Sequence, residues 1–298
     1  MNNKKEFLKR LQSISRSRSI HNTFSDWLEI AATSMHQLPY HSGELEKDED
    51  FYRLEAKYME RIKSYSKDEL TVFFELLWLI TVTYHNSYGD FLGEVAGEEN
   101  LLNKHSGQFF TPYHLCRAIA KMSFGNVEAQ VKEKGIITVC EPAVGAGALV
   151  IASAEEVASQ GIDPRAHLQF DCTDISRDAF NMAYIQLSAL GLQAVVRHGN
   201  TLSNEYWESR PTPQLRLFDC WLQAKRREQQ VKKMIALLTG LPAPKSEEPA
   251  AIAAEAIPNE PSSETLFDLE PFAAPKLSKS RASRRADVHL GEQMELFG

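Results

Sequence analysis

The spacing of apolar residues predicts that the first third of the chain is helical. Over residues 1–105, apolar side chains recur every three or four positions, most clearly in FSDWLEIAATSMHQL, FYRLEAKYMERIKSY and ELTVFFELLWLITVTYH. This period is typical of amphipathic helices, and proline and glycine are scarce in these segments. We therefore expect a helical N-terminal domain over residues 1–105.

Residues 106–240 show a different pattern. Short runs with the composition of strands, GIITVCEP, HLQFDCTDI and QAVVRHGN, alternate with the helical runs ALVIASAEEVASQG and RDAFNMAYIQLSALG. Such alternation predicts βαβ units on a parallel sheet. We expect a fourth strand at Leu215–Asp219 and a basic helix from about Trp221 to Leu238.

The composition changes again after Leu241. Proline, alanine, glutamate and serine dominate the segment PAPKSEEPAAIAAEAIPNEPSSET, and a basic cluster follows at Lys276–Arg285. A segment of this kind buries too little apolar surface to fold by itself. We expect residues 241–298 to form a disordered tail.

Composition and charge narrow the class of protein. The formal net charge is -7, so any surface that binds nucleic acid has to be a local basic patch. The four cysteines form no CxxC pair, which argues against a zinc site and against a disulfide framework. The longest apolar run, Val72–Tyr84, is too short to cross a bilayer, and the N-terminus does not resemble a signal peptide. We expect a cytoplasmic protein without a metal.

The strongest chemical signal is the segment EPAVGAGAL, Glu141–Leu149, which follows a predicted strand and opens a predicted helix. Gly145 and Gly147 allow a sharp turn and a close approach of the backbone to a ligand. The helix offers free N–H groups at its first turn, and Glu141 can accept a hydrogen bond from a cationic amine. Open α/β sheets bind ligands at this edge. The alternative is a tight turn that holds no ligand.

Two polar residues follow the next two predicted strands. Asp174 lies about 30 residues beyond the glycine segment, where an acid can bond both hydroxyls of a ribose. Its alternative role is to cap the following helix. Asn200 ends the third strand, and it either bonds the edge of an adenine ring or forms a turn.

These motifs together resemble a known family. GQFFTP (Gly107–Pro112), EPAVGAG, TDIS and GNTL occur in the order and spacing of the N6-adenine DNA methylases typified by type I modification subunits. DFLGEVAGE (Asp90–Glu98) is also similar to that family. The resemblance covers about Asp90–Leu202. It implies an α/β, Rossmann-like class I methyltransferase fold with S-adenosylmethionine as the cofactor.

The resemblance also implies which residues bind the cofactor. In chain order they are Phe110, Thr111, Pro112, Glu141, Pro142, Gly145, Gly147, Asp174 and Asn200. The first three would pack on the cofactor and bond it. Glu141, Gly145 and Gly147 would hold its methionine end, and Asp174 would hold its ribose. Asn200 stands where the family commonly has aspartate, so its contact with adenine does not carry over directly.

One motif of the family is missing. In the family an NPP, DPP or SPP tripeptide followed by an aromatic residue comes after the fourth strand, where it holds the target amine and stacks on a flipped base. Here the stretch reads LFDCWLQAKRR, and no such tripeptide occurs in the sequence. Three further strands and a target-recognition domain are missing as well. We therefore expect an incomplete parallel sheet and predict no catalytic residue.

Two short segments resemble QLxLF, the peptide by which bacterial proteins dock on the DNA sliding clamp. QMELF lies in the predicted tail, with Gln293, Leu296 and Phe297 as its contact residues. QLRLF at Gln214–Phe218 is a second copy, for which a strand is the alternative.

The sequence thus predicts a bacterial protein of DNA methylation and restriction-modification that binds S-adenosylmethionine and has DNA as a partner. It is either catalytically impaired or completed by a partner subunit that supplies the missing parts. The alternatives are a non-catalytic accessory protein that docks on DNA or on the sliding clamp, and a decayed fragment without a ligand.

Overall fold

The computed structural model describes residues 3–14, 18–98, 101 and 110–239, which all belong to one compact unit of the chain. The predicted tail over 241–298, with Gln293, Leu296 and Phe297, lies outside the described residues. Residues 102–109 lie outside them too, so only the second half of GQFFTP is described.

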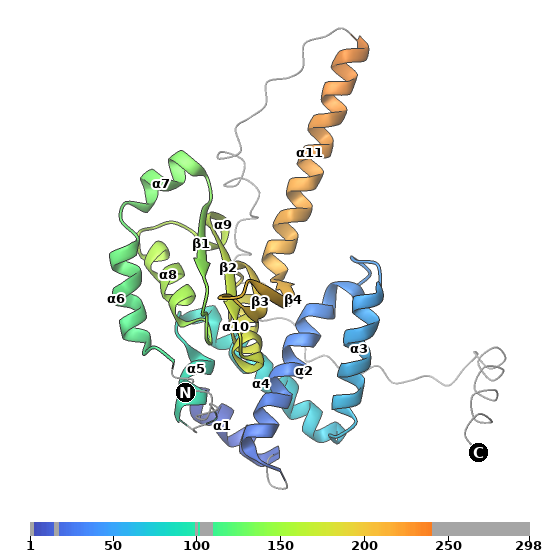
Figure 1. Cartoon of the computed structure of the whole chain (residues 1–298), viewed down its shortest axis with the longest axis vertical. Coiled ribbons are helices and arrows are strands. Elements are labelled where there is room, and N and C mark those ends of the chain that lie inside the picture. The colour runs from blue at the N-terminus through green and yellow to red at the C-terminus, as the bar shows by residue number, and fades with distance from the viewer. Residues whose placement is uncertain (1–2, 15–17, 99–100, 102–109, 240–298) are drawn as a thin grey trace, which may run out of the picture. The chain divides into compact units, whose positions relative to one another are not determined.

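Helices fill the first part of the chain, as the apolar spacing predicts (Figure 1). Side chains cap the start of several of these helices. Asp48 accepts a hydrogen bond from the Phe51 N–H, while Ser66 and Glu69 form a reciprocal capping box. The elements are α1 (Asn3–Ile14), α2 (Ile20–His41), α3 (Glu49–Ile62), α4 (Lys67–Asn86) and α5 (Phe91–Glu98).

The described residues after α5 build a four-stranded sheet in the order β1-β2-β3-β4. The first three strands run parallel, which confirms the predicted α/β, Rossmann-like fold. The strands are β1 (Ile137–Glu141), β2 (Leu168–Asp174), β3 (Gln193–Asn200) and β4 (Glu205–Pro211). The remaining helices are α6 (Tyr113–Ser123), α7 (Val127–Lys134), α8 (Ala148–Ser159), α9 (Pro164–His167), α10 (Arg177–Ala189) and α11 (Pro213–Thr239).

The two faces of the sheet differ in chemistry. One face carries buried apolar side chains, such as Phe170 and Val196, and α10 packs on it. On the other face Asp171 is exposed, and Arg197 donates hydrogen bonds to Asp171 at 2.8 Å and to Ser209 at 3.2 Å. Parallel sheets are usually covered on both faces. Among the described residues, this sheet instead keeps one face polar and partly open to water.

The core runs without a break from the N-terminal helices to the sheet. Trp27 on α2, Leu76 on α4 and Ile185 on α10 are all fully buried members of the same hydrophobic cluster as the sheet residues. A domain boundary at residue 105 falls within 102–109 and stays a prediction.

The predicted fourth strand at Leu215–Asp219 is wrong. The fourth strand is β4, which pairs antiparallel with β3, and the predicted segment lies in the first turns of α11. Pro213 at the first helical position favours a helix start there. Leu215 is buried while Leu217 is 61% exposed. The alternation of apolar and polar residues in LRLF therefore belongs to a helix and not to a strand. The predicted basic helix over Trp221–Leu238 lies within the same helix, α11.

The pattern of residues in EYWESRP does not predict the strand β4, because this segment is rich in charge. Only four residues separate the end of β3 at Asn200 from the start of β4 at Glu205. A connection this short forces the next strand to turn back, since a parallel strand needs a crossover of a dozen residues or more. Asn204 takes the left-handed conformation in this turn, with φ of 57°.

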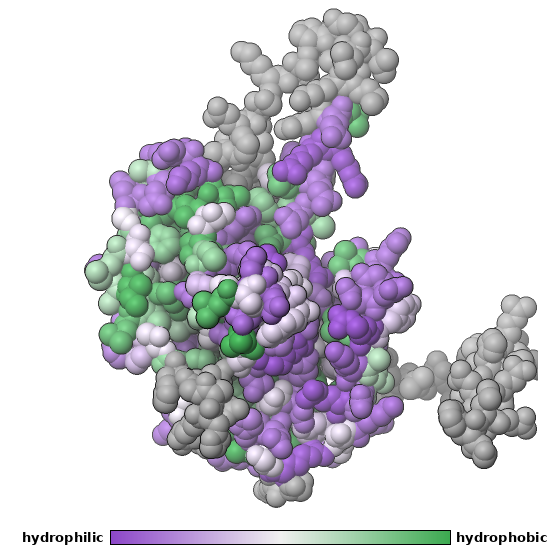
Figure 2. All heavy atoms as spheres, viewed as in Figure 1, coloured by the Kyte–Doolittle hydropathy of each residue, from purple (hydrophilic) through white to green (hydrophobic). Residues whose placement is uncertain are grey.

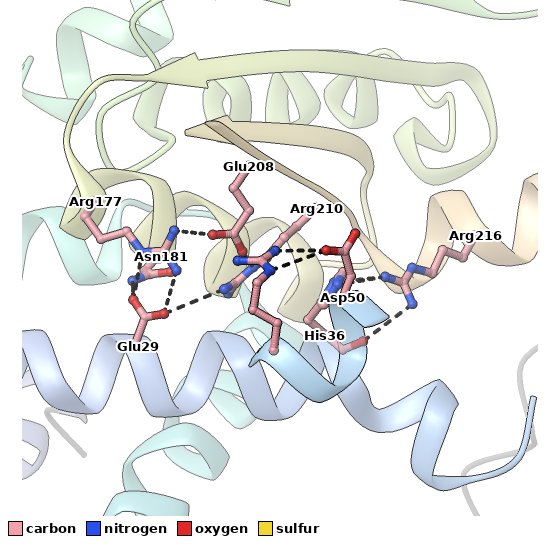
Figure 3. A network of polar contacts seen from close by, with 9 residues as sticks. Glu29, His36, Asp50, Arg177, Asn181, Glu208, Arg210 and Arg216 are labelled. Carbon is pink, nitrogen blue, oxygen red and sulfur yellow. Dashed lines mark hydrogen bonds and ion pairs between the residues drawn. The ribbon is translucent and has the colours of Figure 1, made fainter. Parts of the chain in front are cut away.

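A partly buried cluster of four charges fixes β4 to α2 and α10 (Figure 3). Arg177 on α10 donates to Glu29 on α2 at 2.8 Å and also pairs with Glu208 on β4. Arg210 on β4, which is 0% exposed, donates to Glu208 at 2.6 Å. Burial opposes the ionisation of Glu29, but the bonds and charge of Arg177, with Arg210, lower its pKa to about 2.

Candidate functional site

The glycine loop between β1 and α8 has a backbone that only glycine adopts easily. Gly145 and Gly147 have φ of 56° and 106°, in the left-handed region. A Cβ added at Gly145 would also lie 3.2 Å from the Phe110 ring. No side chain caps the N-terminus of α8, so the N–H groups of its first turn are available to a ligand.

Asp174, at the end of β2, lies against this loop. Its Oδ2 accepts a hydrogen bond from the Gly145 N–H at 2.8 Å, and its Oδ1 accepts one from the Ser176 N–H at 2.8 Å. The cap of α10 is Ser176 and not Asp174, because the Ser176 hydroxyl accepts from the Ala179 N–H. Each carboxylate oxygen keeps a second acceptor position, which can take a ligand hydroxyl.

Glu141 and Pro142 begin the loop at the end of β1. The half-buried Glu141 accepts a hydrogen bond from the Ala143 N–H at 3.1 Å through Oε1, which leaves Oε2 for a cationic group. The Pro142 carbonyl accepts a bond from the Thr201 hydroxyl at 2.7 Å. This contact joins the loop after β1 to the loop after β3, so the ends of the strands form one connected edge.

Asn200 takes the turn alternative. Its Oδ1 accepts hydrogen bonds from the Leu202 N–H at 3.0 Å and the Ser203 N–H at 3.4 Å. The amide nitrogen Nδ2 remains as a donor, so Asn200 can offer a ring an N–H group but no free acceptor oxygen.

The described part of GQFFTP lies beside the same loop. Phe110 is half-buried, and its ring lies so close to Gly145 that a Cβ at that position would be in tight contact with it. Thr111 and Pro112 are exposed, and Pro112 occupies the N-cap position of α6. The structure therefore brings Phe110 to the glycine loop and leaves the other two side chains open to solvent.

Two apolar residues at this edge were missed by sequence reasoning. Ile175 follows Asp174 and is 61% exposed, and Leu202 lies two residues after Asn200 and is 99% exposed. An exposed apolar side chain beside each polar residue suits a flat apolar ring of a ligand. Both residues belong to motifs that the sequence analysis identified, TDIS and GNTL. Only the structure shows that their side chains are exposed.

A groove of about 1030 Å³ lies elsewhere, between α2 and α3 on one side and β4 and the start of α11 on the other. Its lining includes Trp207, Tyr40, five carboxylates and two arginines, and none of the predicted cofactor residues. It is therefore not the site that the motifs indicate. Within the described ranges, no group of three or more metal-ligating side chains comes together, and no helix is long and apolar enough to span a membrane.

The cofactor edge thus offers an acceptor for an amine at Glu141, an acceptor for hydroxyls at Asp174, and free helix N–H groups. The exposed apolar side chains of Ile175 and Leu202 lie next in sequence to these polar groups. The described cofactor candidates from Glu141 to Asn200 lie at or just after the carboxyl ends of β1, β2 and β3, and Phe110 lies beside Gly145, whereas Thr111 and Pro112 are exposed. The arrangement fits a ligand that combines an amine, a ribose and an aromatic ring.

Comparison with known proteins agrees with this chemistry. Residues 85–223 match the family model described as N-6 DNA Methylase. No curated protein matches the chain. A solved structure assigned to the class I S-adenosylmethionine-dependent methyltransferases, from Listeria monocytogenes, shares 13% identity at a TM-score of 0.35. The match covers 68% of this chain and 55% of that one, so the chain spans about half the length of the protein it resembles. Residues 85–223 therefore resemble the N-6 DNA methylases, and S-adenosylmethionine is the cofactor that this likeness implies.

Proposed function

We propose that this chain is the cofactor-binding part of an adenine-N6 DNA methyltransferase of a restriction-modification system, and that a partner polypeptide supplies its catalytic loop. The observation that carries the proposal is the contrast between the polar groups gathered at the carboxyl ends of β1 and β2 and a sequence that continues into α11 without an NPP-type motif. After Phe218-Asp219, where the sequence would place the family's NPP-type motif, the chain instead continues as the helix α11.

The residues of the site fit S-adenosylmethionine. Glu141 would hold the cationic amine of the methionine end, and the backbone of the glycine loop would lie against that end. Asp174 would bond the ribose hydroxyls, and Ile175 and Leu202 would flank the adenine ring. The cofactor supplies the methyl group, and positioning it against the target amine is the larger part of catalysis.

Two features of the surface support a partner polypeptide. Among the described residues, β1 pairs with β2 alone, so one edge of the strand that carries the glycine loop is unpaired. On α6, Leu115, Ile119 and Met122 form an apolar stripe that is 47%, 44% and 88% exposed. Figure 2 shows apolar residues gathered over α6 and α8, whereas the surface over α11 and α3 is mostly hydrophilic.

The proposal is tested by two measurements on the full chain. Calorimetry with S-adenosylhomocysteine should detect binding. Incubation with S-adenosylmethionine and plasmid DNA should produce no N6-methyladenine above background, because the sequence contains no tripeptide of the kind that holds the target amine in the family. The absence of any binding at millimolar ligand would refute the cofactor site. Methylation by the chain alone would refute the need for a partner.

The second candidate function is a non-catalytic accessory protein that docks on DNA or on the sliding clamp. The sequence match at Gln293, Leu296 and Phe297 supports it, although these residues lie outside the described ones. The internal copy, Gln214–Phe218, is a poor candidate because it is the start of a helix with Leu215 buried. The two functions differ in whether a neighbouring gene encodes the missing NPP-type loop.

A further inference from the structure

A buried polar network joins the N-terminal helices to the glycine loop. Its centre is Gln186 on α10, which is fully buried. Its Nε2 donates a hydrogen bond to the Ala146 carbonyl at 2.6 Å and another to Asp90 Oδ1 at 3.0 Å. Because Ala146 lies between Gly145 and Gly147, Gln186 contacts the backbone of the cofactor loop itself.

The amide of Gln186 is held in one orientation from its other side. Its Oε1 accepts hydrogen bonds from the Leu92 N–H at 2.8 Å and from the Tyr84 hydroxyl. A glutamine amide has two donors and two principal acceptor positions, and all four are used here. A reversed amide would place donors against the Leu92 N–H and leave the Ala146 carbonyl unpaired, which is costly in a buried site.

Asp90 connects this network to α5. Its Oδ1 also accepts the Gly93 N–H at 3.0 Å and so caps the helix. A Cβ at Gly93 would lie 2.0 Å from Asp90 Oδ2, so only glycine fits at this position. The segment Asp90–Gly93 therefore holds Gln186, which in turn contacts the backbone of the glycine loop.

We propose that Gln186, held by Asp90, is a positioning residue for cofactor binding, because it fixes the Ala146 carbonyl and with it the conformation of the glycine loop. A loop with two left-handed glycines has a flexible backbone unless its surroundings hold it. The proposal rests on the proposed function, since it concerns affinity for S-adenosylmethionine. It also gives DFLG a role alongside the glycine motif.

The chain offers a matched control for this role. Gln193 is also a buried glutamine, and its Nε2 donates to the Arg165 carbonyl at 2.6 Å at the opposite end of the sheet. Gln186→Met and Gln193→Met remove the same amide from two buried sites. Both should lower the melting temperature. Only Gln186→Met should weaken S-adenosylhomocysteine binding, by about ten-fold or more, as expected for a lost buried hydrogen bond that sets the loop.

A second readout does not depend on the cofactor. Hydrogen exchange of the backbone amides of residues 144–149 should become faster in Gln186→Met and stay unchanged in Gln193→Met. If Gln186→Met does not fold, Tyr84→Phe removes only one hydroxyl from the same network. That variant should weaken binding by about three-fold and speed exchange in the loop.

Equal losses of affinity in Gln186→Met and Gln193→Met, or loop exchange that responds to neither Gln186→Met nor Tyr84→Phe, would overturn the positioning role. A wild-type chain that binds no S-adenosylhomocysteine, while loop exchange responds only to changes in the Gln186 network, would overturn the proposed function. In that case the role of Gln186 in holding the loop would still be supported.

Discussion

The glycine loop and the β4–α11 region belong to one sheet, yet different chemistry holds them in place. The loop is fixed by hydrogen bonds to its backbone, from Gln186 to a carbonyl and to Asp174 from an N–H group. β4 is fixed by the charges of Glu29, Arg177, Glu208 and Arg210. The first arrangement leaves N–H groups and acceptors for a ligand. The second joins the sheet to α2 and α10.

The largest expected effect comes from breaking the charge cluster. Glu29→Ala leaves Arg177 and the buried Arg210 with one carboxylate between them, and it should lower the free energy of unfolding by about 3 kcal/mol. Urea unfolding measures this loss. The control is Glu128→Ala, which removes the exposed ion pair with Lys132 and should leave the free energy of unfolding almost unchanged. Similar losses in the two variants would show that the cluster does not hold β4.

Low pH should destabilise the folded chain through His36, which lies on α2 and contacts Arg216 on α11. Burial and the charge of Arg216 lower the pKa of His36 to about 3 from its ordinary 6.5. Between these two pKa values His36 binds a proton in the unfolded chain but not in the folded chain. The contribution of His36 to the free energy of unfolding is therefore fully present above pH 6.5 and is lost as the pH decreases towards 3. Between pH 7 and pH 5 the loss from His36 should be about 1–2 kcal/mol.

The variant His36→Gln isolates this effect. It should remove that part of the pH dependence, since the difference between its urea unfolding curves at the two pH values lacks the histidine. Glu29 contributes separately, because its stabilisation is lost only as the pH falls from about 4.5 towards 2. An unchanged slope between pH 7 and pH 5 in His36→Gln would rule out a neutral buried histidine.

Changes at the glycine loop are expected to alter the affinity for S-adenosylhomocysteine. Asp174→Ala should weaken S-adenosylhomocysteine binding by about 1–3 kcal/mol, because the ribose hydroxyls and the Gly145 N–H lose their acceptor. Calorimetry measures the change. Asp174→Asn keeps one acceptor oxygen and should lose less. An Asp174→Ala variant that binds as tightly as the wild type would move the ligand away from this edge.

The smallest effect is expected at the clamp-like peptide inside α11. Leu217→Ala should leave any binding to a bacterial sliding clamp unchanged, because Gln214–Phe218 is helical and not extended. Leu296→Ala with Phe297→Ala should abolish that binding, since the two side chains contribute roughly 3–6 kcal/mol of burial before ordering costs. A pull-down of the clamp compares them. Loss of binding in Leu217→Ala would assign docking to the internal copy.

The parts of the fold and site that could be predicted from the sequence are those with local patterns. Three- and four-residue spacing located α2, α3 and α4, and the alternation of strand and helix runs located β1, β2 and β3. The glycine loop was predictable because two glycines after a strand make a turn that few other residues allow. Asp174 and Phe110 were assigned by the resemblance to the family, and the structure brings both to that loop.

What the sequence could not decide depended on distant partners. LRLF reads equally as a strand or as the first turn of a helix, and β4 is too charged to predict as a strand. The role of the charges in β4 is clear only in the folded chain, where Arg210 lies over the Phe180 ring of α10 and near Glu29, which is 181 positions earlier in the chain. The role of Gln186 was hidden for the same reason. A buried amide acts through contacts, and Asp90, Leu92 and Ala146 come together around it only in the tertiary structure.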